Sequence, residues 1–426
     1  MQHPNDLRRH IQEGGLDARL CAVCGCGPSA LGTKRARLLK LLDAYQAAFA
    51  ADEEVGLFSG PGRTEMGGNH TDHQRGRVLA AAVDLDALAC AGPSGDDVIR
   101  ILSEGYPELR VDLSCLTPKK EEEGSSAALV RGIAARIREL GYQPHGFHAC
   151  VNSTVLGGSG LSSSAAYEVM IGVILNHLYC GDELDMVQIA QIGQYAENVF
   201  FGKPCGLMDQ MASSVGGMVT IDFETEDAKV EAIACDFAAR GYALCVVNTG
   251  GNHGDLTDDY AAIRTEMEAV AAQFGKKVLR EVPQHEVEEN VGRLRRAVGD
   301  RAVLRALHYY DENERVLEQV AAIKAGDLYR FFDSVKRSGD SSWKLLQNVY
   351  ARPNEEQMAM GIELSRRFLG GDGAQRVHGG GFAGTIQAYV PMGRLPAYIG
   401  MIEAAFGPGS CTPLMIRPEG AVMMPM

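Results

Sequence analysis

Apolar residues recur every three or four positions between residues 34 and 51, and most positions between them are charged, polar or alanine. This repeat matches the turn of an amphipathic helix that buries one side. The expected buried side consists of Leu38, Leu41, Leu42, Tyr45 and Phe49. We therefore predict a helix over 34–51.

The apolar pattern then changes to longer runs. Residues 55–64 predict a strand that ends in a Gly-Pro-Gly turn, and residues 77–92 predict a strand or another buried segment. Residues 124–142 return to helical spacing, and Gly141 is a typical helix end. Helices and strands are thus mixed along the first third of the chain.

The remaining segments continue this mixture. Residues 147–181 predict a strand, a glycine loop and a helix, whose buried side consists of Ala166, Val169, Met170, Val173 and Leu178. Two more helices are predicted near 183–200 and 255–275, and the charged stretch 276–300 predicts a surface helix or loop. Residues 375–391 predict two strands joined by a glycine turn.

Composition narrows the function classes. The chain has 426 residues, 46% of them hydrophobic, which is enough for two domains with real cores. A net charge of -14 argues against nucleic acid or an anionic membrane as partner, because both are held by clustered cations. We see neither an apolar run of about 20 residues nor a signal-peptide core, and so expect a cytoplasmic protein.

The eleven cysteines are odd in number and scattered, which is typical of reduced thiols. Only "CAVCGCG", with Cys21, Cys24 and Cys26, has a spacing that could serve zinc. A fourth ligand and a distal Cys pair are missing from the pattern. We therefore expect a loosely packed N-terminal extension with free thiols, and metal binding is the minor alternative.

The loop "GGSGLSSSAA", residues 157–166, suits a phosphate. Glycines let backbone approach a ligand closely, a helix start offers free N–H groups, and serines can donate to phosphate or ligate magnesium. A well-capped helix is the alternative, since Ser is also a favoured N-cap. The Walker A motif is excluded because the loop has no lysine, and a dinucleotide fingerprint fails because a second helix follows instead of a strand.

Two carboxylates follow in "YAENVFFGKPCGLMDQ". The glycine-bearing turn between Glu197 and Asp209 can bring both into one cleft. Phosphoryl transfer uses one carboxylate on magnesium and one near the attacking hydroxyl. A helix-end Glu and a capping Asp are the alternative, just as a simple hairpin turn can explain the glycine triplet in "HGGGFAGT", residues 378–385.

Taken together, the motifs resemble one family. The stretch "GRTEMGGNHTDHQRG" that begins at residue 62, the loop at 157–166 and "HGGGFAG" occur in the order of the three motifs of the galactokinase branch of the GHMP small-molecule kinases. "AENVFFGKPCGLMDQ" and "VVNTGGNHGDLTDDYAAIR" resemble further segments of that branch. The likeness runs from about residue 34 to the C-terminus.

The resemblance implies catalytic and metal-binding roles. Arg63 matches the arginine beside the sugar's anomeric hydroxyl and the transferring phosphoryl group, and Asp209 matches the aspartate that accepts or orients the hydroxyl proton. A guanidinium next to Asp209 would keep it ionised and stabilise developing negative charge. Ser164, together with Ser163, and Glu197 match magnesium-binding positions.

The resemblance also implies two ligand-binding groups. The ATP phosphates would be held by Gly157, Gly158, Ser159, Gly160, Leu161, Ser162, Ser163 and Ser164. The sugar hydroxyls would be held by His70, Asp72, Gly206 and Tyr260. The implied partners are a small sugar and ATP, and the implied assembly is a monomer or a weak homodimer.

The implied fold is α+β, with two domains, the active site in the cleft between them and a ferredoxin-like C-terminal domain. We divide the chain into an extension, 1–33, a GHMP kinase N-terminal domain, 34–215, and a C-terminal domain, 216–426. The final glycine loop would support the phosphate loop from the C-terminal side.

Two departures from the family pattern affect the substrate. Asn69 stands where galactokinases carry a Glu that reaches the sugar's C6 hydroxyl, and Arg75 follows Asp72 by three residues. A neutral Asn and a nearby cation would suit a C6 carboxylate, and "NHTDHQ" is also similar to a stretch of plant galacturonate kinases. Alternatively, Asn69 bonds a neutral hydroxyl and Arg75 points to solvent. Ala383 in place of a family glycine is a smaller change.

The expected activity is a galactokinase that uses ATP and Mg2+ and phosphorylates the C1 hydroxyl. A galacturonate 1-kinase, or a 1-kinase for another C6-modified sugar, is the alternative within the enzyme class. A catalytically silent sugar and ATP sensor is the alternative from another class. The complete catalytic set argues against the sensor.

Overall fold

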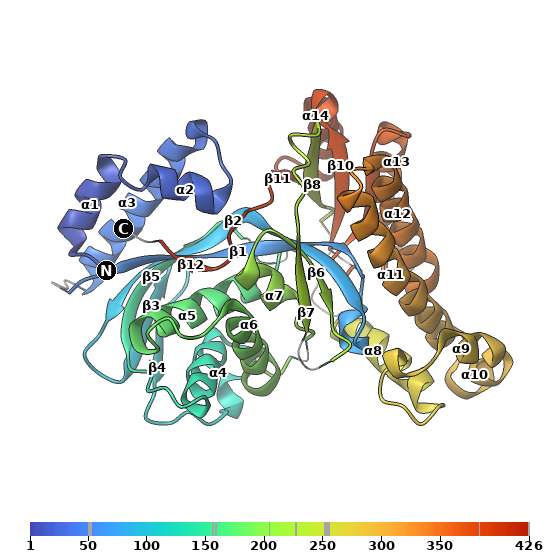
Figure 1. Ribbon diagram of the computed structural model, residues 1–426, viewed down its shortest axis with the longest axis horizontal. Helices are drawn as coiled ribbons and strands as arrows, with labels where there is room; N and C mark the ends of the chain where they lie inside the picture. The colour runs from blue at the N-terminus through green and yellow to red at the C-terminus, as the bar shows by residue number, and fades with distance from the viewer. Residues whose placement is uncertain are drawn as a thin grey trace.

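The computed structural model describes residues 1–49, 53–155, 157, 160–203, 205–225, 228–250, 256–382 and 384–424. Three positions with an expected role, Gly158, Ser159 and Ala383, lie outside these described residues. The described chain builds one sheet of eight strands and one of four, each with helices against it (Figure 1). The expected α+β class is confirmed.

The larger sheet has the order β12-β1-β2-β5-β3-β4, and β6 and β7 extend it from β2. Strand β3 runs parallel to β5, and the other described pairs are antiparallel. The strands are β1 (Gly56–Gly67), β2 (Arg77–Pro93), β3 (Val98–Ser103), β4 (Leu109–Asp112), β5 (Phe147–Ser153), β6 (Met218–Asp222), β7 (Lys229–Ile233) and β12 (Val422–Met423).

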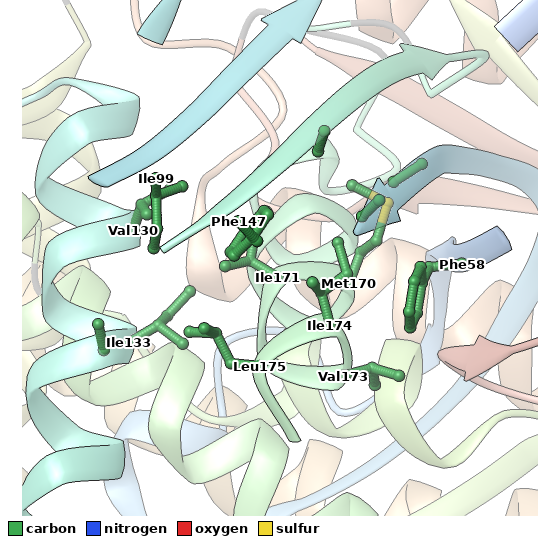
Figure 2. Close-up of a cluster of buried hydrophobic side chains, with 14 of the residues drawn as sticks. Phe58, Ile99, Val130, Ile133, Phe147, Met170, Ile171, Val173, Ile174 and Leu175 are labelled. Carbon is green, nitrogen blue, oxygen red and sulfur yellow. The ribbon is translucent and has the colours of Figure 1, made fainter. Parts of the chain in front are cut away.

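Helices cover one face of this sheet and make its main core. They are α4 (Ser126–Glu139), α5 (Ser163–Tyr179), α6 (Met186–Tyr195) and α7 (Met208–Val215). Figure 2 shows side chains of α5, such as Met170 and Ile174, packed between Phe58 of β1 and Phe147 of β5. The helical patterns at 124–142 and 183–200 are thereby confirmed.

The N-terminal segment covers the opposite face. It forms α1 (Pro4–Gln12), α2 (Asp17–Cys24) and α3 (Leu31–Phe49). The helix expected over 34–51 is confirmed as far as Phe49, and its last two positions lie outside the described residues. Along β2, Ala87 and Ala89 face the main core, while Leu88 and Cys90 face these N-terminal helices. Successive side chains of a strand point to opposite faces, and β2 is therefore buried on both.

The expectation of a loosely packed extension is wrong. Leu7, Ile11 and Leu20 are fully or almost fully buried against α3 and the sheet, and Arg19 pairs with Glu419 through two bonds of 2.5 and 2.7 Å. The three clustered cysteines are buried or half-buried. No group of three or more His, Cys, Asp or Glu side chains in the described part of the chain is placed to hold a metal ion.

The smaller sheet has the order β11-β8-β10-β9 and is antiparallel. Its strands are β8 (Tyr242–Asn248), β9 (Ala374–His378), β10 (Thr385–Pro391) and β11 (Cys411–Leu414). Helices join β8 to β9, and α14 (Leu395–Phe406) joins β10 to β11. This β-α-β-β-α-β succession is the ferredoxin-like arrangement expected for the C-terminal part, and the glycine hairpin between β9 and β10 is confirmed.

Helices dominate the connection from β8 to β9. The main ones are α8 (Thr257–Ala272), α11 (Asp300–Lys324), α12 (Leu328–Ser341) and α13 (Gln357–Leu369). The charged stretch 276–300 forms short helices, including α9 (Gln284–Glu289) and α10 (Val291–Val298), which bury Val287 and Leu294. No helix in the described ranges is long and apolar enough to cross a membrane.

Two expectations about chain breaks need revision. The Gly-Pro-Gly segment at 60–62 is not a turn, because β1 runs through it with only a register shift between Pro61 and Arg63. The glycines are needed for packing: a Cβ atom at Gly60 would overlap the carbonyl oxygen of Ala166 in α5. The expected division of the chain at residue 215 is the second of these, because β6, β7 and β12 follow that residue and still lie in the larger sheet.

Candidate active site

Arg63 and Asp209 form a bidentate ion pair where β1 meets the start of α7. Nε and Nη2 of Arg63 donate to the two carboxylate oxygens of Asp209 at 2.6 and 2.7 Å. Burial would raise the pKa of Asp209, but Arg63 outweighs it and, with Ser162, lowers that pKa below its usual value. Asp209 is therefore ionised at neutral pH and remains partly exposed, at 31% of its side chain.

The phosphate loop touches this pair directly. Nη1 of Arg63 donates to the carbonyl oxygen of Gly160 at 2.5 Å, and Oγ of Ser162 donates to Asp209 at 2.8 Å. Ser162 has a φ of 57°, in the left-handed region that L-residues rarely adopt, and its side chain does not cap α5. Such strain is typical of ligand-binding loops, and here it turns the hydroxyl toward Asp209.

The C-terminal sheet supports the phosphate loop from behind, as expected. A Cβ atom at Gly160 would overlap Oγ1 of Thr385 and lie 2.9 Å from Nδ1 of His378. His378 is buried and lies 3.0 Å from both Thr385 Oγ1 and Thr64 Oγ1. Strands β9 and β10 are thereby fastened to β1 beneath the loop.

The glycine triplet 379–381 binds residues of the first motif and of α8. Asn69 donates its side-chain amide to Gly379 O at 2.7 Å, and Tyr260 donates its hydroxyl to Gly381 O at 2.9 Å. His70 Nε2 lies 3.0 Å from Gly380 O. Burial lowers the pKa of His70 to about 4, so its neutral ring donates through Nε2 and keeps Nδ1 as an acceptor.

Asp72 lies on the side of the site where the sugar is expected. It lies against Gly206, where an added Cβ atom would overlap Oδ2 of Asp72. Burial first, and then the nearby charge of Asp209, raise the pKa of Asp72 to about 6. Two carboxylates from separate motifs thus share one partly buried region, with the phosphate loop beside it.

A second acidic cluster lies behind Asp209. Gln210 donates its side-chain amide to Glu197 at 2.8 Å and to Glu168 of α5 at 2.9 Å. Burial and the neighbouring Glu197 raise the pKa of Glu168 well above its usual value, and its buried Oε1 has no hydrogen-bond partner among the described residues. Lys203 Nζ lies 3.1 Å from Oε1 of Glu197. These carboxyl groups therefore lie where a cation stabilises them.

Comparison with known proteins agrees with this geometry. Residues 43–93 match the galactokinase galactose-binding signature, and residues 125–217 match the GHMP kinases N terminal domain. The galactokinase of Streptomyces coelicolor is 32% identical over 367 residues, which cover 85% of this chain and 91% of that protein. A galactokinase of Actinobacillus pleuropneumoniae is 34% identical over 337 residues, covering 78% and 84%.

The chain belongs to the galactokinase family. Among solved structures, the Lactococcus lactis galactokinase complexed with galactose has the same fold, with a TM-score of 0.79, 23% identity, and coverage of 89% of this chain and 98% of that one. The Methanococcus jannaschii mevalonate kinase matches with a TM-score of 0.61 at 15% identity, covering 85% and 98%. The expected family and fold are confirmed.

Asn69, expected to contact the sugar, is not placed to do so in this galactokinase-family protein. Its side chain is fully buried, and its oxygen accepts from Ser342 at 3.1 Å and Asn348 at 2.9 Å. Its amide nitrogen donates to Glu65 and Gly379. All four hydrogen-bonding positions of an Asn side chain are filled by protein, so none remains for a ligand.

Arg75 agrees with the alternative in which its side chain points to solvent, and not with the expected sugar contact. Its side chain is 46% exposed, and its Nη1 lies 3.4 Å from Oε1 of Glu281, a residue that follows α8 in the chain. With a φ of 57°, Arg75 ends the short helix Asp72–Gln74. Ser163 and Ser164 lie in the first turn of α5, and Glu197 accepts a hydrogen bond from Gln210. The magnesium-binding roles of Ser163, Ser164 and Glu197 stay predictions.

Several site residues escaped the sequence reasoning. Gln210, Glu168 and Lys203 link to Glu197, and His378 supports Gly160. The position of Gln210 directly after Asp209 was an available signal. Glu168 follows Ser164 by four residues, which places both on one side of α5.

Proposed function

We propose that this protein is a galactokinase that transfers the γ-phosphoryl group of ATP to the C1 hydroxyl of galactose. The observation that carries the proposal is the Arg63–Asp209 pair, which is joined by two hydrogen bonds and contacts the phosphate loop. The pair lies beside Asp72, in the motif that matches the galactose-binding signature. A phosphoryl donor and a sugar hydroxyl would meet at Asp209.

In the proposed reaction the C1 oxygen forms a bond to the γ-phosphorus while the bond from that phosphorus to the β,γ-bridging oxygen breaks, and ADP leaves. Ionised Asp209 orients the C1 hydroxyl and receives its proton. Arg63 fixes the Asp209 carboxylate and places positive charge beside the phosphoryl oxygens. Backbone N–H groups at the start of α5 hold the phosphates, because a helix N-terminus attracts anions.

The residues present also suit Mg2+. Magnesium binds through one or two carboxylates together with substrate phosphates and water, so few protein ligands are needed. Glu197 would hold it with the hydroxyl of Ser164, and Glu168, whose buried Oε1 has no hydrogen-bond partner among the described residues, lies in the same cluster. When bound, Mg2+ would neutralise charge on the phosphates.

Galactose is favoured over galacturonate by what faces the site. A C6 carboxylate needs a cation or several donors, but Arg75 is paired with Glu281 and Asn69 is saturated within the protein. The available sugar contacts are Asp72, Nδ1 of His70 and the hydroxyl oxygen of Tyr260. These groups are all suited to neutral hydroxyls.

The test is ADP release with Mg-ATP and four sugars, namely galactose, galacturonate, N-acetylgalactosamine and glucose. The proposal expects the highest kcat/KM with galactose and a product that is phosphorylated at C1, identified by 31P NMR. Preference for galacturonate would overturn the assignment of the C6 pocket. Absence of turnover with all four sugars would overturn the proposed activity.

A further inference from the structure

Lys203 is a cation at the active site that the sequence motifs did not assign. It follows the π-turn Ala196–Phe201, and both ends of the residue are bound to Glu197. Its backbone N–H donates to Glu197 O at 3.1 Å, and its ammonium lies 3.1 Å from Glu197 Oε1. The Lys203 side chain is 62% exposed, whereas that of Glu197 is 4% exposed. The ammonium therefore stands at the open side of a buried carboxylate.

The charge of Lys203 reaches the reacting groups. It is one of the charges, after Arg63, that lower the pKa of Asp209, and it opposes the burial that raises the pKa of Tyr260. Glu197, which the ammonium contacts, also accepts a hydrogen bond from Gln210, the residue directly after Asp209. The ammonium is thus linked through Glu197 and Gln210 to the segment that carries Asp209.

Phosphoryl transfer needs more positive charge than Arg63 offers freely. Three nitrogens of the Arg63 guanidinium already donate to Asp209 and to Gly160 O. The phosphate loop itself contains no lysine, unlike loops in which a lysine reaches the β- and γ-phosphates. Lys203 has a flexible stem and three N–H donors. Among the described residues, its ammonium donates to the carboxylate of Glu197.

We propose that Lys203 is a catalytic residue that contacts the γ-phosphoryl oxygens of bound ATP. Without nucleotide its ammonium pairs with Glu197, and with nucleotide it turns to the γ-phosphate and supports the charge that spreads over those oxygens in the transition state. Lys203 keeps its proton throughout and forms no covalent bond. The inference rests on the proposed phosphoryl transfer for its kinetic part alone.

The test compares nucleotides that differ in the γ-phosphate. Binding of ADP and of a non-hydrolysable ATP analogue, both with Mg2+, is measured by isothermal titration calorimetry for the wild type and Lys203→Met. We expect the variant to bind the analogue about 10- to 100-fold more weakly, the worth of a hydrogen bond to a charged group. ADP binding should change by less than about twofold, and Lys203→Arg should recover most of the analogue affinity.

Kinetics and a matched control complete the design. Lys203→Met should lower kcat by about 10- to 100-fold and leave KM for galactose within about twofold. Lys40→Met is the control, because Lys40, in α3, is also an exposed lysine paired with a glutamate. Its side chain is 68% exposed, and its Nζ lies 2.6 Å from Oε1 of Glu104. The control should match the wild type in every assay, and equal melting temperatures would show that the variants are folded.

Two results would overturn the inference. If Lys203→Met binds both nucleotides as the wild type does, Lys203 does not contact phosphate. If it weakens ADP and the analogue equally, Lys203 only shapes the loop around Glu197. The binding measurements need no sugar. If the wild type phosphorylates none of the sugars but Lys203→Met still binds the analogue more weakly, the proposed function and the catalytic role of Lys203 are refuted, and its contact with the γ-phosphate is supported.

Discussion

The carboxylate of Asp72 lies against the backbone of Gly206, and a Cβ atom at position 206 would overlap Oδ2 of Asp72. The two residues belong to different motifs, one after β1 and the other just before α7. Asp209 follows Gly206 by three residues, so the same short segment places both the backbone that Asp72 packs against and the carboxylate of Asp209. Glycine at 206 is therefore a requirement of the site.

Gly206→Ala tests this relationship. The added methyl group must displace Asp72, so we expect KM for galactose to rise by about tenfold or more with a smaller change in kcat, because misplacement of a binding group by about 1 Å is costly. Gly371→Ala is the control, since a Cβ atom there meets nothing within 4 Å. An unchanged KM in Gly206→Ala would show that Asp72 does not bind the sugar.

Asp209→Asn tests the catalytic pair. The amide keeps the shape of the carboxylate but can neither receive the proton nor balance the charge of Arg63, so we expect kcat to fall by about a thousandfold. Galactose binding, measured by calorimetry, should remain within about fivefold of the wild type. Near-normal kcat in a folded Asp209→Asn variant would remove Asp209 from the mechanism.

The sequence motifs predicted the members of the site better than the directions of their side chains. Arg63, Asp209 and Gly160 stand in short glycine-bearing strings whose backbone is constrained, and they meet as expected. Asn69 and Arg75 stand in an equally distinctive string, but one side chain points into the interdomain core and the other to solvent. Motif spacing does not determine which way a side chain faces.

The sequence contained a signal that the N-terminal helices cover the larger sheet. Residues 77–92 are almost continuously apolar, whereas a strand with one solvent-exposed face alternates apolar and polar residues. Such a run indicates burial on both faces, and the second cover is α1 to α3. Lys203 had no comparable signal, because its position depends on the π-turn that carries it to Glu197.

The raised pKa of Asp72 predicts a pH dependence. With a pKa of about 6 in the folded protein, Asp72 is ionised at pH 7.5, where it could accept the sugar hydroxyls as proposed, and it becomes protonated as the pH falls through 6. We expect kcat/KM for galactose to fall about tenfold per pH unit below 6, mainly through KM. Asp72→Asn should have low activity without this inflection, and an inflection that persists in Asp72→Asn would assign it to another group.

Asn69→Glu separates a structural role for Asn69 from a role in sugar preference. The new carboxylate would be buried beside Glu65 and would lose the two amide donors to Glu65 and Gly379, so we expect a loss of about 3–5 kcal/mol in the free energy of unfolding. Denaturant unfolding at pH 8 measures this loss.

Arg75→Ala is the comparison within the same motif, because Arg75 is exposed and its ion pair is long. Its unfolding free energy should change by about 0.5 kcal/mol or less, and its preference for galactose over galacturonate should match the wild type. A stable Asn69→Glu variant with altered sugar preference would contradict the buried role of Asn69 and return that side chain to the sugar pocket. A loss of stability with the preference intact would mean that Asn69 holds the first motif to the glycine triplet, and that sugar choice rests with Asp72, His70 and Tyr260.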